Sequence, residues 1–169
     1  WLGDVNLNYN FGDVSLTSIS SYTDRDVLVI RDTTSLSASI LGPALLLPES
    51  VYTLHGPPID ATKAKVFTQE LRFAGGKEKF RWVAGGFYSH TKRHYNQDLR
   101  AEGFTEATGI PTQGLLPRQN SLFASDLDYK LDQFALFGEA TVSLTDELDL
   151  IGGLRYYHFS EDKAQFFDG

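Results

Sequence analysis

The chain has 169 residues, of which 41% are hydrophobic and 13% aromatic, and its formal net charge is −7. This length suits one domain by the usual prior of roughly 100–200 residues, and the negative charge argues against nucleic acid as a partner. Because the chain contains no cysteine, disulfides, thiolate metal sites and cysteine nucleophiles are excluded. No stretch approaches the roughly 18 consecutive apolar residues of a membrane-spanning helix. The chain does not start with Met and shows no signal peptide, so we expect a processed or truncated start.

The first part of the chain predicts two strands and a long loop. Residues 4–11 alternate polar and apolar side chains, which indicates a strand with one apolar and one polar face. Gly12 and Asp13 mark a tight turn, and a second strand runs from 14 to about 30. Residues 31–65 read as a long loop whose apolar run, 40–47, is interrupted by Pro43. This loop is more apolar than a solvated loop requires, so we expect it to fold over a neighbouring surface or to contact a ligand or a partner protein.

The rest of the chain predicts two further hairpins. A third strand at 66–74 is followed by a short polar turn at 75–79 and a fourth strand from 80 to about 96. A second long loop covers 97–125. The last hairpin spans about 127–159 and turns at 145–147.

Short and long connections therefore alternate strictly along the chain. This order predicts an all-β protein, an antiparallel meander of about six long strands with tight turns at one end and long loops at the other. The second and fourth strands have roughly 16 residues, whereas the usual length is about 5–6. Long strands with this loop asymmetry are typical of a transmembrane β-barrel, in which short turns face the periplasm and longer loops lie outside.

The last hairpin separates charge from apolar side chains in the way that a barrel wall requires. One alternating set carries no charge and is expected to face lipid: Phe134, Leu136, Gly138, Ala140, Val142, Leu144, Leu148, Leu150, Gly152, Leu154 and Tyr156. The other set, which includes Glu139, Asp149 and Arg155, is expected to face a polar lumen. A half-buried antiparallel sheet of a soluble protein is the alternative.

Three motifs, one of them made of two segments, also resemble TonB-dependent outer-membrane receptors. The segments FTQELRFAGG (67–76) and FRWVAGGFY (80–88) look like one hairpin of that family. The segment QFALFGEATVSLTDELDLIGGLRY (133–156) is similar to its next hairpin, and VSLTSISSY (14–22) to the strand before them. The three occur in family order and the resemblance covers nearly the whole chain.

The resemblance implies a 22-stranded transmembrane barrel plugged by an N-terminal domain in the bacterial outer membrane. It implies no enzyme but active uptake of a scarce small-molecule nutrient, often a ferric siderophore or similar metal chelate, coupled to an inner-membrane energy-transducing complex. Residues 1–169 would then be a partial barrel in contact with membrane lipid. The plug and the remaining strands would be absent, and the loops at about 31–65 and 97–125 would be extracellular.

The sequence shows no catalytic constellation and predicts no cofactor. His90 and His94 would lie about 13 Å apart on a strand, at roughly 3.3 Å per residue, so a shared metal is not expected. A ligand would instead meet the outer rim, where Arg93, His94, Tyr95 and Arg100 form a basic and aromatic cluster. The alternative is that these four side chains are ordinary polar decoration of the rim.

The pattern of faces also predicts how two hairpins align. In the hairpin after Val66, we expect Phe73 opposite Trp82 and Glu70 opposite Gly85, because a shift that opposes Arg72 to Arg81 is unfavourable. In the last hairpin we expect Leu144 opposite Leu148 and Glu139 opposite Gly153. Arg155 is then the diagonal neighbour of Glu139. The two would form an ion pair on the lumen wall or, alternatively, each would bind the plug.

Three functions are open at this stage. They are a TonB-dependent transporter, a passive porin-type channel and a soluble β-sandwich binding module. The sequence does not identify the substrate.

Overall fold

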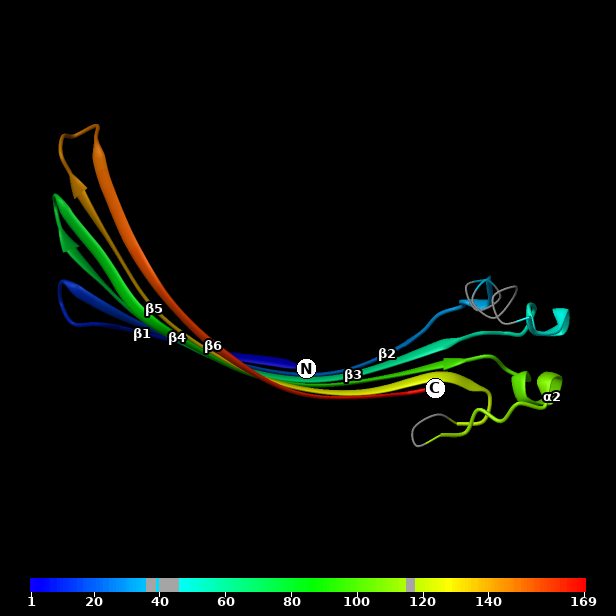
Figure 1. Cartoon of the computed structure of the whole chain (residues 1–169). Coiled ribbons are helices and arrows are strands. Elements are labelled where there is room, and N and C mark those ends of the chain that lie inside the picture. The colour runs from blue at the N-terminus through cyan, green and yellow to red at the C-terminus, as the bar shows by residue number, and fades with distance from the viewer. Residues whose placement is uncertain (36–38, 40–45, 115–117) are drawn as a thin grey trace. The chain divides into compact units, whose positions relative to one another are not determined.

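The protein is described from a computed structural model, which covers residues 1–169 except 36–38, 40–45 and 115–117. The chain forms six strands: β1 (Leu2–Asn10), β2 (Val14–Ile30), β3 (Pro58–Lys77), β4 (Phe80–Arg100), β5 (Ser121–Ser143) and β6 (Asp149–Asp168). A short 3₁₀ helix, η1 (Glu49–Val51), and a short α-helix, α2 (Phe104–Thr108), lie in the two long connections. The strands form one antiparallel sheet in the order β1-β2-β3-β4-β5-β6 (Figure 1). The predicted all-β meander is confirmed.

The strands are longer than the sequence pattern indicated, and the long loops are correspondingly shorter. β3 begins at Pro58 rather than at Val66, β4 continues to Arg100, and β5 begins at Ser121. The loops are therefore 31–57 and 101–120 instead of 31–65 and 97–125. The additional strand residues carry polar side chains on both faces, so they lack the alternation of apolar and polar residues that reveals a strand with one apolar face.

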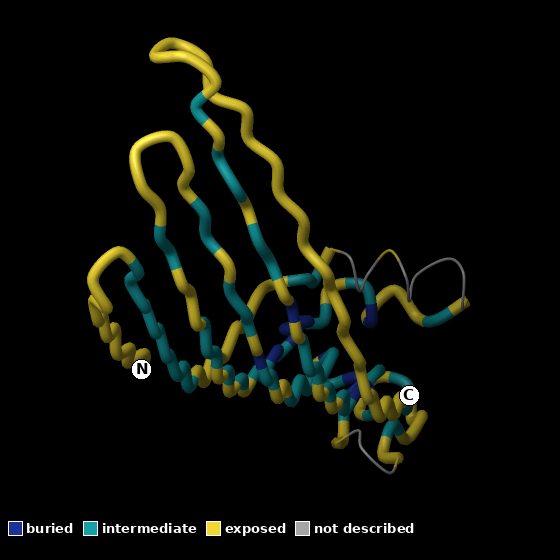
Figure 2. Tube along the Cα trace, turned by 90° about the vertical axis from the view of Figure 1, so that its left-hand side faces the viewer, coloured by how far each residue is buried: buried dark blue, intermediate teal, exposed yellow. Residues whose placement is uncertain are grey.

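The strands divide into two compact units. The first contains residues 1–24, 64–92 and 129–162, and the second contains 25–63, 93–128 and 163–169. The tight turns of the three hairpins all belong to the first unit, and the loops that carry η1 and α2 belong to the second (Figure 1). Few residues are buried in either unit (Figure 2).

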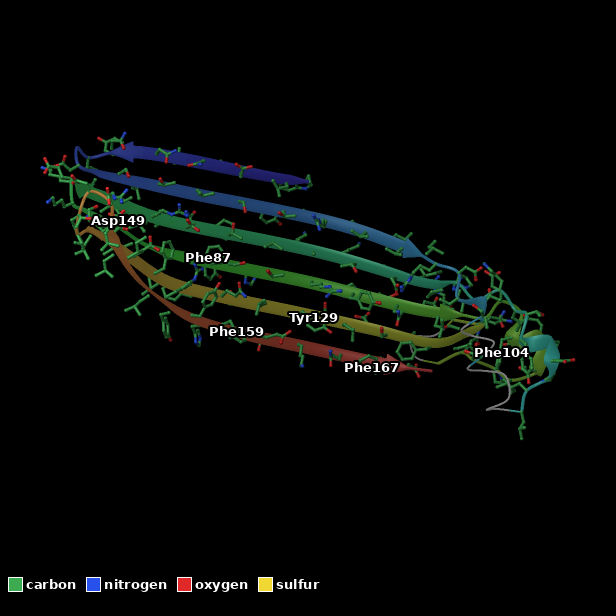
Figure 3. The ribbon with its side chains drawn as sticks, turned by 90° about the horizontal axis from the view of Figure 1, so that it is seen from above. Phe87, Phe104, Tyr129, Asp149, Phe159 and Phe167 are labelled. Carbon is green, nitrogen blue, oxygen red and sulfur yellow. The ribbon has the colours of Figure 1, made fainter. Side chains whose placement is uncertain are left out.

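The second unit contains a small core where its loops pack together. Val51, Ala101 and Phe104 are almost fully buried there. Leu47, Tyr52, Leu54 and Leu122 pack against them. Figure 3 shows Phe104 among the loops, beyond the ends of the strands. The described end of the apolar loop 31–57 thus packs partly on the other long loop. Most of its apolar run, 40–47, lies outside the described residues.

The two faces of the sheet follow the predicted alternation. We call the face that carries Leu71, Phe73 and Leu136 the outer face, and the opposite face, which carries Arg81 and Glu139, the inner face. Side chains from three strands line one shallow apolar hollow on the outer face; they include Gln69, Leu71, Phe73, Ala84, Gly86, Tyr88 and Phe134. Phe134 of β5, which belongs to the set predicted to face lipid, therefore shares the outer face with apolar side chains of β3 and β4.

The alignment of β5 with β6 is the predicted one. The amide of Leu144 donates to the carbonyl of Leu148 at 2.8 Å, which places these residues opposite each other across the turn. A Cβ added to Gly153 would lie 3.4 Å from Cβ of Glu139, so these two residues also face each other. Glycine at 153 leaves room beside the Glu139 side chain.

The alignment of β3 with β4 differs from the predicted one by two residues. Glu78 and Lys79 form a two-residue turn, so Lys77 faces Phe80. At the far end of the same pair, the amide of Arg100 donates to the carbonyl of Pro57 at 3.3 Å, which keeps the same alignment. The prediction that Phe73 faces Trp82 is therefore wrong.

Gly75, rather than Phe73, lies opposite Trp82. A Cβ at Gly75 would lie 3.1 Å from the Trp82 indole. The turn decides the alignment because Glu78 adopts a positive φ of 33°, as the tight turns of two-residue hairpins require. The residue types in the turn do not reveal the positive φ of Glu78, so the prediction missed this turn.

Candidate functional site

A buried carboxylate organises the inner face of the second unit. Asp60 on β3 is 8% exposed. Its Oδ1 accepts hydrogen bonds from the Tyr95 hydroxyl at 2.9 Å and from Nε2 of Gln97 at 2.8 Å. Its Oδ2 accepts from the guanidinium of Arg31, with which it forms an ion pair. The Asp60 carboxylate thus links Arg31, which directly follows β2, to Tyr95 and Gln97 on β4.

The hydrogen bonds of Asp60 outweigh the cost of its burial. Burial by itself raises the pKa of the carboxyl. The hydrogen bonds from Gln97, Tyr95 and Arg31, together with the positive charge of Arg31, lower it further than burial raises it. The pKa of Asp60 therefore lies below its ordinary value, and the carboxylate is ionised at neutral pH.

Tyr95 also contacts the first of the predicted rim residues. The guanidinium of Arg93 lies 5.3 Å from the centre of the Tyr95 ring, a distance typical of a cation–π interaction. Arg93 and Tyr95 are two residues apart on β4 and therefore share its inner face. Arg31, Arg93 and Tyr95 thus present two cations and one aromatic ring on the inner face, and Asp60 orients two of them. We call these four residues the inner-rim cluster.

The other two predicted rim residues do not join this cluster. His94 lies between Arg93 and Tyr95 in the sequence and therefore points to the outer face. There its Nδ1 lies 3.0 Å from a carboxylate oxygen of Asp128 and 3.5 Å from one of Asp126. Arg100 ends β4 and donates from Nε to Asp98 at 2.9 Å. The structure thus places Arg93 and Tyr95 together on the inner face and His94 on the outer face, because the alternation of a strand separates neighbours in sequence. Ligand binding by Arg93, His94, Tyr95 and Arg100 stays a prediction.

Arg31 and Asp60 were not predicted as site residues. Each lies about 30 residues or more from Tyr95 in the sequence, and only the alignment of β2, β3 and β4 brings them together. One feature of the sequence could have revealed them. Asp60 and Thr62 are polar residues two apart in an extended segment, as are Tyr95 and Gln97.

His94, Asp126 and Asp128 are the residues that could hold a metal ion within the described part of the chain. Their ligand atoms all lie within 4.8 Å of one another. All three side chains are more than a third exposed. The Asp128 carboxylate also lies within hydrogen-bond distance of Nδ1 of His94, so the contacts in this group do not require a metal.

The predicted inner-face residues Glu139 and Arg155 lie on the same face, but they do not form the predicted ion pair in the structure. The guanidinium of Arg155 lies 5.4 Å from the ring centre of Phe137 and 4.8 Å from that of Tyr157. It also donates to the Tyr157 hydroxyl at 3.3 Å. Two aromatic rings surround the cation, so Arg155 turns away from its diagonal neighbour on β5.

A different ion pair occupies the inner face near the tight turns. The guanidinium of Arg81 on β4 donates to Asp149 on β6 at 2.8 Å, and the hydroxyl of Ser143 on β5 donates to the same carboxylate at 2.6 Å. Figure 3 shows Asp149 at the turn end of the strands. These contacts link three neighbouring strands across one face.

A family model for the TonB-dependent receptor-like β-barrel matches residues 1–168. The chain belongs to this family. The resemblance inferred from the strand motifs is thereby confirmed, and a soluble β-sandwich is excluded as its fold. In transmembrane barrels, the apolar face of the wall is the one that meets lipid.

A solved structure shows the same fold. The chain is similar to the ferric yersiniabactin uptake receptor of Yersinia pestis, with a TM-score of 0.62 and 14% sequence identity. The match covers 98% of this chain and 24% of that receptor, so the barrel segment spans about a quarter of its length. No curated protein sequence matches the chain. None of the described helices has both the length and the apolar composition to cross a membrane.

Proposed function

We propose that this barrel segment is part of an outer-membrane receptor that takes up a scarce nutrient, most specifically a ferric siderophore or a similar metal chelate, by TonB-dependent active transport. The observation that carries the proposal is the family match over residues 1–168. The similarity to a ferric siderophore receptor supports the substrate class. In this proposal the barrel has 22 strands, and a plug and an energy-coupling segment lie elsewhere in the intact protein.

The inner-rim cluster is the part of this segment that we propose to meet the ligand. Arg31 and Arg93 supply positive charge, and Tyr95 supplies an aromatic face, on the side of the sheet that would line the lumen. Ferric chelates are often anionic or aromatic, so both features fit them. Asp60 is too buried to meet a ligand itself; its role is to position Tyr95 and Arg31.

The orientation of the segment follows from the same proposal. The tight turns of the first unit would face the periplasm, and the loops 31–57 and 101–120 would lie outside the cell. Glu139 and Arg155 would line the lumen wall, where either could contact the plug. The inner-membrane energy-transducing complex would be reached through parts of the protein other than this segment.

Growth and uptake in iron-limited cells test the proposal. Deletion of the complete gene is expected to abolish uptake of at least one labelled ferric chelate, and the intact gene is expected to restore it. Arg93→Ala is expected to lower uptake at limiting ligand by weakening binding. Lys79→Ala, at a tight turn, is the control and is expected to leave uptake unchanged. Unchanged uptake of every ferric chelate in the deletion strain would contradict the substrate class.

A passive porin-type channel is the remaining alternative. The two functions differ in their need for energy. A protonophore is expected to stop uptake by a TonB-dependent receptor and to leave diffusion through a channel unchanged. Uptake that persists after the proton-motive force has been dissipated would favour the channel.

A further inference from the structure

Main-chain hydrogen bonds continue the sheet past the ends of β2 and β4 into both long loops. Residues 55–58 lie between residues 31–33 and residues 100–102, and we call these three segments the loop base. The loop base contains Arg31, which is the one member of the inner-rim cluster outside the regular strands. The bonds run from amide to carbonyl and join Arg31 to Pro58 at 3.3 Å, Thr33 to Gly56 at 2.9 Å, Arg100 to Pro57 at 3.3 Å and Glu102 to His55 at 2.9 Å.

Few hydrogen bonds can hold the loop base together. Pro57 and Pro58 have no amide hydrogen, so their main chain accepts hydrogen bonds but donates none. The amide of Gly56 donates to the Thr34 hydroxyl at 3.2 Å, and the Thr33 hydroxyl donates to the carbonyl of Gly56 at 2.7 Å. Residues 56–58 are all buried, so neighbouring side chains cover this part of the loop base.

The apolar core of the second unit adjoins the loop base. Ala101, which is fully buried, belongs to both. Phe104 of α2 follows Glu102 by two residues, and Val51 of η1 precedes His55 by four. Phe104 and Val51 are 5% and 1% exposed. The core therefore holds two of the three segments of the loop base close to their ends.

Phe104 takes its place in the core through contacts with the rest of the unit. The helix α2 has five residues, which is too short for a helix to be stable alone. The amide of Phe104 donates to the carbonyl of Ala101 at 3.0 Å, and the amide of Thr105 donates to Oδ1 of Asn120 at 2.8 Å. Of the three fully packed residues of the core, Phe104 has the largest side chain and buries the most apolar surface.

Arg31 depends on the loop base for its position. Its side chain is 58% exposed, and its guanidinium pairs with Asp60 from the exposed side. Holding a long side chain in one geometry costs rotamer freedom, so a largely exposed ion pair stabilises that geometry little. The amide of Arg31 makes a long hydrogen bond to Pro58, at 3.3 Å. The guanidinium is therefore held beside Asp60 mainly because the main chain at 31–33 is fixed.

We propose that Phe104 is a positioning residue for Arg31. Through Val51 and Ala101 it keeps the loop base closed, and the closed loop base holds the Arg31 guanidinium beside Asp60 on the inner face. The inference rests on the proposed function, in which Arg31 meets the ligand. It means that the loop 101–120 controls a ligand-facing cation that belongs to a different loop, so that substitutions in α2 alter ligand affinity without touching the ligand.

Hydrogen exchange of the full-length receptor in detergent tests the first step. Replacement of a buried phenylalanine by alanine favours opening of its surroundings by at least about a hundredfold. Phe104→Ala is therefore expected to accelerate exchange of the amides at 31–34, 54–56 and 101–105 by at least about that factor. Phe104→Leu keeps most of the apolar volume and is expected to retain most of the protection.

Phe166→Ala is the matched control for this measurement. Phe166 is also a phenylalanine of the second unit, but its side chain is 44% exposed and lies outside the core. This variant is expected to leave the exchange of the loop base unchanged.

Chemical modification of arginine tests the second step. Phenylglyoxal reacts fastest with guanidinium groups that are released from ion pairs, and mass spectrometry of peptides gives the rate for each arginine. Arg31 is expected to react as fast in Phe104→Ala as in Asp60→Ala, which removes its partner directly. The double variant Phe104→Ala/Asp60→Ala is expected to react no faster than Asp60→Ala, because both changes release the same group. Arg93, within β4, is expected to keep its wild-type rate in Phe104→Ala.

Three results would overturn the proposal. The first is wild-type reactivity of Arg31 in Phe104→Ala together with faster exchange at 101–105, which would show that the core opens without releasing Arg31. The second is an equal increase in the reactivity of Arg31 and Arg93, which would show general loosening of the wall. The third is the same set of changes in Phe166→Ala.

A milder variant keeps the test decisive if Phe104→Ala does not assemble. Val51→Ala removes less apolar surface from the same core and is expected to give the same pattern with a smaller increase in exchange. None of these measurements uses a ferric chelate. Failure of the proposed function would therefore leave the coupling of Phe104 to Arg31 standing, and failure of the coupling would leave the measured uptake unaffected.

Discussion

Replacing Asp60 with alanine tests whether one carboxylate holds the inner-rim cluster together. The substitution removes two hydrogen bonds to a charged acceptor, from Tyr95 and Gln97, and each such bond contributes about 1.5–3 kcal/mol. The ion pair with Arg31 adds at most about 1 kcal/mol, because the Arg31 side chain is 58% exposed. Water that enters the site compensates part of this loss. We therefore expect local opening to become easier by about 3 kcal/mol, a roughly hundredfold increase in the open population.

Hydrogen exchange of the intact protein measures that local opening. Amides at 58–62 of β3 and 95–100 of β4 are expected to exchange roughly a hundredfold faster in Asp60→Ala, since they open locally rather than with the whole barrel. Tyr95→Phe, which removes one of the two hydrogen bonds, is expected to show a smaller increase.

Asp26→Ala is the matched control for this measurement. Asp26 is also an acid of the second unit, but its side chain is 70% exposed and its partner, Lys63, lies 3.8 Å away. We expect no measurable change in exchange for this variant. Wild-type exchange in Asp60→Ala, or equal acceleration in both variants, would refute the reasoning that burial and hydrogen bonding give Asp60 its role.

Three further predictions concern packing, lipid contact and pH. Gly85→Ala is expected to reduce the yield of assembled protein, because its new Cβ would lie 2.6 Å from the Phe137 ring, whereas Gly152→Ala, with nothing within 4 Å, should assemble normally; equal yields would contradict this. Leu136→Arg on the outer face is expected to destabilise the barrel by up to about 2–4 kcal/mol, seen as a lower midpoint of urea unfolding, and an unchanged midpoint would argue against the lipid-facing assignment. The pKa of Asp60 is lowered in the folded protein. Its stabilising contribution is therefore complete above the ordinary pKa of about 3.9 and is lost as the pH falls below that value. Hydrogen exchange of the amides at 58–62 is then expected to accelerate below about pH 4 in the wild type, relative to Asp60→Ala.

The faces of the sheet were predictable because a strand has a strict period of two. The apolar and uncharged set of the last hairpin identified its outer face, and Leu144 and Leu148 then fixed its alignment. In the hairpin after Val66, the faces were also right. Its alignment was wrong by two residues, because moving a strand by two preserves every face and only the geometry of the turn distinguishes the choices.

The candidate site was harder to predict than the fold. Arg93 and Tyr95 were recognisable from their types and spacing on one strand. Asp60 and Arg31 were missed because their contacts depend on the alignment of three strands. His94 was grouped with Arg93 and Tyr95 because it is their neighbour in sequence, but the alternation of the strand places it on the other face. The long extensions of β3 and β5 were missed for a related reason, since they carry polar residues on both faces, including the buried Asp60 and Ser121, and so show no apolar period.

The alternation of faces also limits which insertions and deletions the strands tolerate. Deletion of one codon within β4 would move every later side chain of that strand to the other face, so that Arg93 would point outward and His94 inward. Only paired deletions, or a compensating bulge, keep both faces intact. The connections 31–57 and 101–120 have no alternation of faces to preserve, and loops tolerate changes of length. Evolutionary change in the length of this protein is therefore expected to concentrate in those two loops, which can vary without disturbing the two faces of the sheet.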